Sequence, residues 1–174
     1  MDIQETPKVK CIIGIIYSPD SEIKSCIKHL EKVFGPADLI SPEYDFDITN
    51  YYEKEMGKNL KRCFVSFDKL IDADKLAEIK RVSNIIEMDY AKRDDRSINL
   101  DPGYLDMDKL VLASAKYGRQ KIYLNKGIYA DPCLYFFKKQ FYSHEWSFPD
   151  FTSGLYNDYF IKVRKAYKDS IKIL

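Results

Sequence analysis

Asn99 and Asp101 belong to the segment of this sequence that is most specific in its residue types. Residues 99–104 read Asn-Leu-Asp-Pro-Gly-Tyr. Alternate side chains of a strand share a face, so Asn99 and Asp101 would point to one face and Leu100 to the other. The Asp-Pro-Gly tripeptide is typical of a tight turn. The segment predicts either a plain strand end and turn, or a polar pair at a carboxyl strand end, where open sheets often hold ligands.

Three cationic side chains could hold an anion beside this pair. Lys109 and Lys116 are a heptad apart, and we expect a helix over residues 106–117 that places both on one face. Arg62 lies in an apolar segment, residues 60–67, that predicts a strand. A lysine pair of this spacing is more often simply part of a solvated helix face.

An aromatic and acidic segment contributes further candidates. Tyr51 could stack on a ring, and Glu53 and Glu55 follow it as carboxylates in the expected ligand site. Asp45 and Asp47, spaced by one residue, are weak candidates for Mg²⁺ or Mn²⁺, as is Asp101. A solvated strand face explains that spacing as well, and the residues indicate no particular cofactor.

Several common sites are excluded by the residues present. The chain has no phosphate-binding P-loop and no glycine-rich dinucleotide loop. In Asn125-Lys126-Gly127-Ile128, Ile128 stands where a guanine-reading motif needs Asp. His29 and His144 are the only histidines, too few for a His-rich zinc site. With 28 basic and 27 acidic residues, the formal charge of +1 argues against a duplex nucleic acid partner.

The pattern of apolar runs and caps predicts an α+β fold in one domain over residues 1–174, with residues 1–7 as a loose tail. Val9–Tyr17 is a continuous apolar run that predicts a buried central strand. We expect helices over residues 18–34, 72–92 and 155–172, further strands over residues 97–101 and 121–124, and a hairpin in 128–142 turning near Lys138 and Lys139. The expected architecture is a mixed sheet with packed helices. Its N-terminal part would be ferredoxin-like (split βαβ), extended by further strands and helices.

The four cysteines predict a reducing compartment. Cys11, Cys26, Cys63 and Cys133 form no Cys-x-x-Cys pair, and each has apolar neighbours. We therefore expect reduced, mostly buried thiols. With no signal peptide and no membrane-spanning run, we expect a soluble, cytoplasmic protein.

Several segments together make the chain resemble an uncharacterised prokaryotic family, a domain of unknown function. They are Phe34-Gly35-Pro36, Tyr51-Tyr52-Glu53 with Glu55-Met56-Gly57, Phe64-Val65-Ser66-Phe67, Asn99-Leu100-Asp101-Pro102-Gly103-Tyr104-Leu105, Lys109-Leu110-Val111-Leu112-Ala113, Ile122-Tyr123-Leu124, Gly127-Ile128-Tyr129-Ala130 and Phe148-Pro149-Asp150. The resemblance spans nearly the whole chain. It implies a single domain and carries no activity, cofactor or catalytic residue.

Two functions follow as hypotheses. The first is a site, with or without catalysis, for a small anionic or phosphorylated ligand such as a nucleotide or metabolite, where Asn99, Asp101, Lys109 and residues 51–55 converge on one cavity. The second is a non-catalytic interaction or assembly module with an exposed aromatic patch, formed by Tyr51, Tyr52, Trp146 and Phe148. A homo-oligomer is compatible with either.

Overall fold

The central strand of the sheet is β1 (Val9–Tyr17), as the apolar run predicts. The computed structural model describes residues 2, 4–91 and 95–172, and within them β1 lies between β4 (Lys61–Ile71) and β5 (Ile98–Leu105). All nine residues of β1 are buried. Strands with both faces covered are apolar throughout rather than alternating, which explains the pattern.

The described residues form one nine-stranded sheet in the order β2-β4-β1-β5-β6-β8-β7. The remaining strands of this order are β2 (Ala37–Ile40), β6 (Lys109–Ser114), β7 (Ile122–Asn125) and β8 (Ile128–Phe137), while β3 (Tyr44–Asp45) pairs with β4 and β9 (Gln140–Ser143) pairs with β8. Every pairing is antiparallel, so the expectation of a mixed sheet is wrong. A mixed sheet needs two parallel strands to be neighbours. Strands β1 and β2 run in the same direction, but β4 lies between them and is antiparallel to both. The order β5-β1-β4-β2 is compatible with the ferredoxin-like plan, which stays a prediction.

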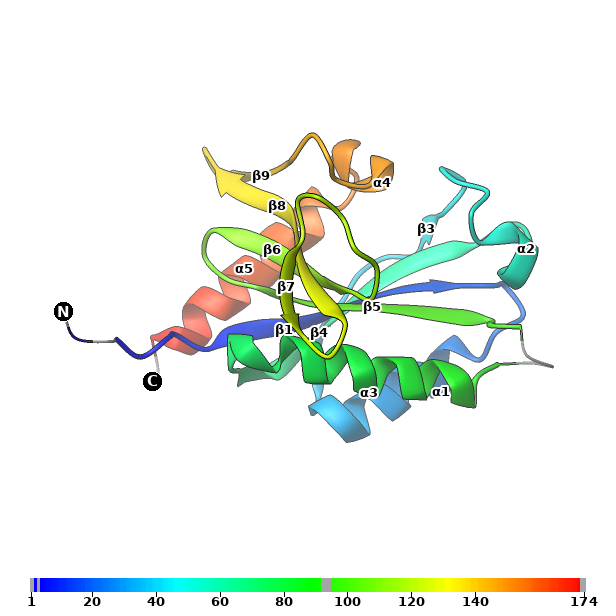
Figure 1. Cartoon of the computed structure of the whole chain (residues 1–174), viewed down its shortest axis with the longest axis horizontal. Coiled ribbons are helices and arrows are strands. Elements are labelled where there is room, and N and C mark those ends of the chain that lie inside the picture. Colours follow the sequence, from blue (N-terminus) through cyan, green and yellow to red (C-terminus); the bar gives the residue numbers. More distant parts are fainter. Residues whose placement is uncertain (1, 3, 92–94, 173–174) are drawn as a thin grey trace.

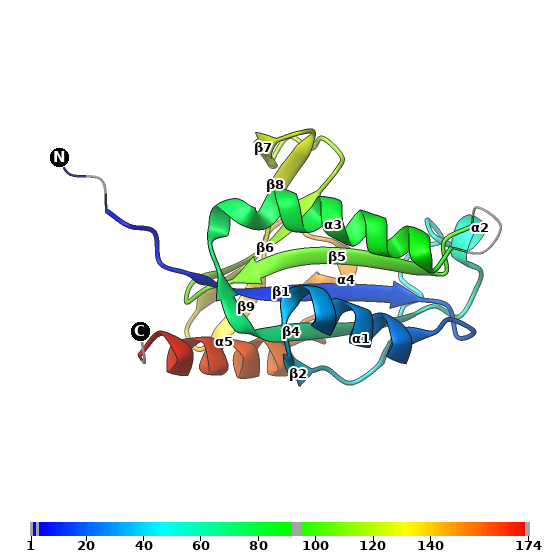
Figure 2. The same cartoon turned by 90° about the horizontal axis from the view of Figure 1, so that it is seen from below.

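Helices cover both faces of the sheet (Figures 1 and 2). On one face lie α1 (Ile23–Phe34) and α3 (Leu76–Asp89), which follows a 3₁₀ turn at Ala73–Lys75. The other face carries α5 (Asn157–Ile171), with the short helices α2 (Glu53–Met56) and α4 (Pro149–Thr152) nearby. The three long helices were predicted from their apolar periodicity. Lys92, the expected end of α3, lies outside the described residues.

Residues 97–117 differ most from the prediction. The chain does not turn at Asp101-Pro102-Gly103, because β5 continues to Leu105, and residues 109–114 form β6 rather than a helix. Pairing with β6 covers only residues 103–105 of β5, so the N–H that Pro102 lacks is not needed there. A Cβ on Gly103 would lie 2.4 Å from the Val111 carbonyl oxygen. Gly103 therefore serves the close approach of β6 instead of a turn.

Two apolar cores lie on opposite faces of the sheet. Cys26 and Leu30 of α1 belong to the first core, and Phe160 and Val163 of α5 belong to the second. The hairpin turn at Lys138 and Lys139 was predicted and is present, with positive φ at both residues. Among the described residues, no helix has the length and apolar character that crossing a bilayer requires.

The four cysteines are buried and unpaired, as predicted. Burial raises the pKa of the Cys11, Cys26 and Cys63 thiols to about 12, and it also raises the pKa of Cys133. Buried thiols with such pKa values are poor nucleophiles. A reducing compartment remains a prediction.

Candidate functional site

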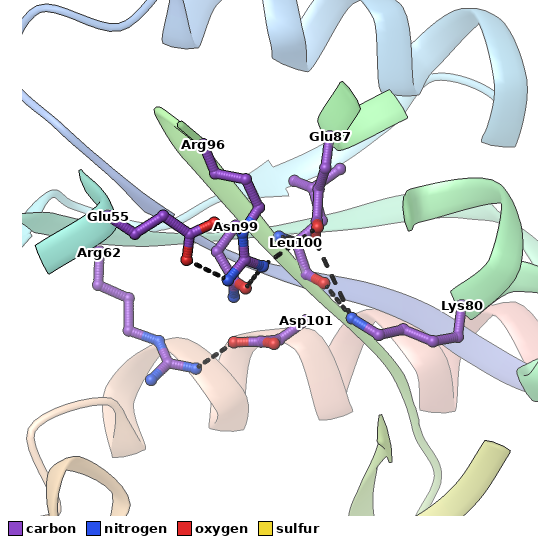
Figure 3. Close-up of polar contacts among 8 residues, drawn as sticks. All are labelled: Glu55, Arg62, Lys80, Glu87, Arg96, Asn99, Leu100 and Asp101. Carbon is purple, nitrogen blue, oxygen red and sulfur yellow. Dashed lines mark hydrogen bonds and ion pairs between the residues drawn. The ribbon is translucent and has the colours of Figure 1, made fainter. Parts of the chain in front are cut away.

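Polar side chains gather around one end of β5, where Asn99 and Asp101 lie on the face of the sheet opposite α1 and α3 (Figure 3). We call this region the polar face and define it by Glu55, Arg62, Arg96, Asn99 and Asp101. Its residues come from α2, β4, β5 and the segment just before β5. The Asn-Leu-Asp-Pro-Gly-Tyr motif is thus part of a strand.

Arg96 connects the polar face to α3. Its guanidinium donates from Nε and Nη2 to the two carboxylate oxygens of Glu55, at 2.6 and 2.7 Å. It also donates to Asn99 Oδ1 at 2.9 Å and to Glu87 of α3 at 3.4 Å. The hydrogen bonds from Arg96 hold the pKa of Glu55 below its usual range. This bidentate pair fixes α2 against β5.

The main chain of Leu100 is capped by two side chains of α3. Glu87 Oε1 accepts from the Leu100 N–H at 2.6 Å, and Lys80 Nζ donates to the Leu100 carbonyl oxygen at 2.7 Å. Both side chains are buried, and burial raises the pKa of Glu87. They reach the part of β5 that β6 does not pair with, and they satisfy backbone groups that burial would otherwise leave unpaired.

Arg62 lies in a cage of aromatic rings. Its guanidinium carbon is 4.9 to 5.7 Å from the ring centroids of Phe46, Phe64, Phe151 and Tyr156. It forms a close ion pair with buried Asp150 and a longer one, of 3.7 Å, with Asp101. Its side chain is only 4% exposed. Arg62 is therefore committed to internal partners, and its expected role as a ligand-binding charge has to be reassigned to the positioning of Asp101.

Tyr51 and Lys116 meet at the exposed rim of the polar face. The ammonium of Lys116 lies 4.4 Å from the centroid of the Tyr51 ring and donates to the Tyr51 hydroxyl. Tyr51 is 60% exposed. Its neighbour Tyr52 packs against Phe46, and burial raises the pKa of the Tyr52 hydroxyl. Glu53 is the first residue of α2.

Lys109 lies away from the polar face, at the opposite end of β5. It pairs with Asp106, and the Asp106 N–H donates to its carbonyl oxygen. At about 3.3 Å per strand residue, Lys109 is roughly 20 Å from Asn99. The hypothesis that placed Lys109 and Lys116 on one helix face is wrong, because Lys109 begins β6 and Lys116 follows its end. The predicted convergence therefore excludes Lys109.

The weak metal candidates do not come together. Asp45 pairs with Lys61 at 2.6 Å, Asp47 is exposed, and Asp101 faces Arg62. Over residues 2, 4–91 and 95–172, no three Asp, Glu, His or Cys side chains are grouped as metal ligands. Both histidines make aromatic contacts, His29 with Tyr90 and His144 with Trp146.

Two surface hollows lie along α3, away from the polar face. The first, of about 380 Å³, is lined by Asp74, Lys75, Glu78, Arg81, Asn125 and Lys126. The second, of about 400 Å³, is lined by Glu78, Arg81, Val82, Asn84 and Ile85. Neither includes a residue that the sequence predicted for the site.

Sequence reasoning missed Arg96, Glu87 and Asp150 as members of this network. Glu87 lies a heptad from Lys80 on one flank of α3, and this spacing was the available signal. Arg96 lies in a charged stretch with no pattern, and Asp150 reaches Arg62 only through the fold. Their roles depend on long-range packing.

The molecule is thus an α+β protein with an antiparallel sheet and a polar network at one strand end. Residues 7–167 match the family model described as a domain of unknown function (DUF4416). The chain belongs to this family, which confirms the resemblance to an uncharacterised family. No curated protein and no solved structure matches it.

Proposed function

We propose that the polar face binds a small anionic ligand, such as a phosphorylated metabolite or a nucleotide. The observation that carries the proposal is the side-chain amide of Asn99, which is 5% exposed. Its oxygen accepts from Arg96, while Nδ2 is buried and has no acceptor among the described residues. A buried donor without an acceptor costs about 1–3 kcal/mol. A ligand oxygen that reaches Nδ2 through a small shift of the surrounding side chains would supply the missing acceptor.

The neighbouring side chains suit an anion with an attached ring. Lys116 is exposed and, within the described residues, has no carboxylate at ion-pairing distance. Tyr51 offers an exposed ring for stacking on a base or sugar. Asp101, held by Arg62, is partly exposed and could accept from a ligand hydroxyl. We assign no catalytic step to these residues.

A thermal-shift experiment tests this function. We expect the melting temperature to rise with phosphate, pyrophosphate or nucleotides, because a ligand that binds only the folded state stabilises it. Lys116→Ala should lose most of this rise. Lys109→Ala is the matched control, since Lys109 is also an exposed lysine but lies roughly 20 Å from Asn99. If no anion raises the melting temperature, or if both variants reduce the rise equally, the proposal is wrong.

The alternative function is an interaction module with an exposed aromatic patch. Tyr51 contacts Tyr52 at the rim of the polar face, Trp146 stacks on His144 in the β9 region, and no ring contact joins these two pairs among the described residues. Phe148 is exposed beside α4. We also propose that the protein is cytoplasmic and has no duplex nucleic acid partner. A homo-oligomer is compatible with both functions.

A further inference from the structure

A row of aromatic rings lies along the hairpin formed by β8 and β9, and Figure 1 shows the backbone of this hairpin. We call it the aromatic stripe, and its members in spatial order are Phe137, Tyr142, Tyr135, His144 and Trp146. Consecutive ring centroids lie 6.4, 5.8, 5.0 and 4.7 Å apart. Strand alternation and the Tyr135–Tyr142 pairing place the strand residues on one face, so the rings form a continuous surface.

The rings of the stripe are exposed yet held in place. Phe137 is 55% exposed, Trp146 46% and Tyr135 41%. The indole N–H of Trp146 donates to the Pro132 carbonyl oxygen at 2.9 Å, and the ring stacks on His144 within 6° of parallel. The turn that carries both rings, residues 144–147, is fixed by Ser147, whose hydroxyl donates to the Cys133 carbonyl oxygen. Rings ordered before binding lose little conformational entropy when a ligand stacks on them.

The size of the stripe favours a narrow partner over a second folded chain. Aromatic side chains bury roughly 200 Å² each, so about four half-exposed rings present roughly 400 Å². A stable protein interface needs about 800 Å² per partner. Extension of the sheet at β9 is also blocked, because the Asn157 amide accepts from Phe141 N–H at 2.9 Å and donates to Phe141 O at 3.1 Å.

Positive charge lies at one end of the stripe. Lys138 and Lys139 form the hairpin tip, and Lys138 Nζ is 5.3 Å from the centroid of the Phe137 ring. Proteins bind single-stranded nucleic acid through two features, aromatic rings and basic side chains. The rings stack on unpaired bases, and the ammonium groups of lysines contact phosphates. Duplex nucleic acid offers only the second contact, since its bases are already stacked.

We propose that the aromatic stripe binds single-stranded nucleic acid, with bases stacked on Tyr135, Tyr142 and Trp146 and phosphates beside Lys138 and Lys139. RNA recognition motifs use sheet-borne aromatics in the same way to stack two or three bases. The stripe does not overlap the polar face, so this inference is independent of the anionic ligand proposed above. With a formal charge of only +1 on the whole chain, affinity would come mainly from stacking.

Trp146 provides a direct readout, because it is the only tryptophan of the chain. Titration with an oligothymidylate of about twelve nucleotides, which is within the usual range of single-strand site sizes, should quench its fluorescence at low salt. The same titration with a duplex of equal length should quench it little. If Lys138 and Lys139 contact two phosphates, the slope of log K against log salt should be about −1.4.

Substitutions separate this proposal from binding elsewhere on the surface. Measured by anisotropy of labelled oligonucleotide, Trp146→Ala and Tyr135→Ala should each weaken binding about fivefold or more. Tyr117→Ala, which removes a 77% exposed ring that contacts Tyr129 and not the stripe, should leave binding unchanged. The Lys138→Ala/Lys139→Ala double variant changes only the loop tip and should flatten the salt slope.

Four outcomes would overturn the proposal. The first is the absence of quenching by any single strand at low salt. Another is equal binding of duplex and single strand. The third is single-strand binding that the ring and lysine substitutions leave intact. Binding of an apolar peptide to the stripe, with no binding of oligonucleotide, would assign the stripe to a protein partner and would also refute the proposal.

Discussion

Gly14 lies in the middle of the buried central strand. Glycine has no side chain, so it contributes fewer packing contacts at this position than any other residue would. It pairs with Phe64 on β4 and with Asp101 on β5. A Cβ at this position would lie 3.1 Å from Phe64 Cε1 and 3.2 Å from Arg62 Nη2. The missing Cβ therefore leaves the space through which the Arg62 guanidinium crosses β1 toward Asp101.

Gly14→Ala should destabilise the protein by about 1–3 kcal/mol, because overpacking a close-packed core forces neighbouring groups to shift. The free energy of unfolding in urea measures the cost. On a Phe64→Leu background, which removes the nearest ring atom, the same substitution should cost less. Equal costs on the two backgrounds would show that the Cβ does not meet the Phe64 ring.

At the level of single residues, the sequence predicted which side chains share a face of a strand, but not which side chains they contact. Strand alternation predicted that Asn99 and Asp101 lie together, and the structure has them on one face of β5. Their partners, Arg96 and Arg62, were not paired with them in advance. Arg62 is distant along the chain, and Arg96 reaches Asn99 only because α2 and α3 pack around it.

Among the elements, Arg96 holds two carboxylates whose pKa values move in opposite directions. Its hydrogen bonds lower the pKa of Glu55 on α2, whereas burial raises the pKa of Glu87 on α3. A carboxyl with a lowered pKa stabilises the fold above its ordinary pKa, and this contribution is lost as the pH falls. A carboxyl with a raised pKa costs stability once it ionises, and the cost disappears as the pH falls.

Glu55→Gln and Glu87→Gln should therefore respond to pH with opposite signs. The stability advantage of the unsubstituted protein over Glu55→Gln should shrink as the pH falls below the ordinary carboxyl value of about 4.5, because the unfolded chain then takes up a proton that folded Glu55 binds only at lower pH. Its stability relative to Glu87→Gln should improve as the pH falls from neutral toward 4.5. Urea unfolding at a series of pH values measures both differences. Slopes of the same sign would contradict the assigned pKa directions.

Elements with a long, single pattern were predictable, and those with short apolar runs were not. β1, α1 and α5 have patterns that fit only one kind of element. The four apolar residues 110–113 fit a helix or a buried strand equally, and the neighbouring chain decides between them. Here β5 and β8 are placed to pair with them, and this pairing makes β6 a strand.

Across the whole molecule, side chains cap main-chain groups that no neighbouring strand pairs with, in three strands. Glu31 accepts from the Ala37 N–H of β2 at 3.1 Å, and the Tyr159 hydroxyl donates to Leu39 O of the same strand at 3.1 Å. Glu87 and Lys80 cap β5 at Leu100, and Asn157 caps β9 at Phe141. Unpaired strand edges can pair with other chains, so these caps oppose aggregation.

Asn157→Ala tests this use of caps at β9. The variant loses two hydrogen bonds to Phe141 and should be less stable by about 1–2 kcal/mol. It should also self-associate more than the unsubstituted protein as the concentration rises, because the edge of β9 becomes available for pairing. Sedimentation velocity measures the second effect.

Asp158→Ala is the matched control for Asn157→Ala. It removes an exposed side chain from the same first turn of α5 and leaves the cap on Phe141 in place. The control should therefore sediment as the unsubstituted protein does. If Asn157→Ala loses stability but does not self-associate more than Asp158→Ala, then Asn157 joins α5 to β9 without protecting the edge, and the second role assigned to it is wrong.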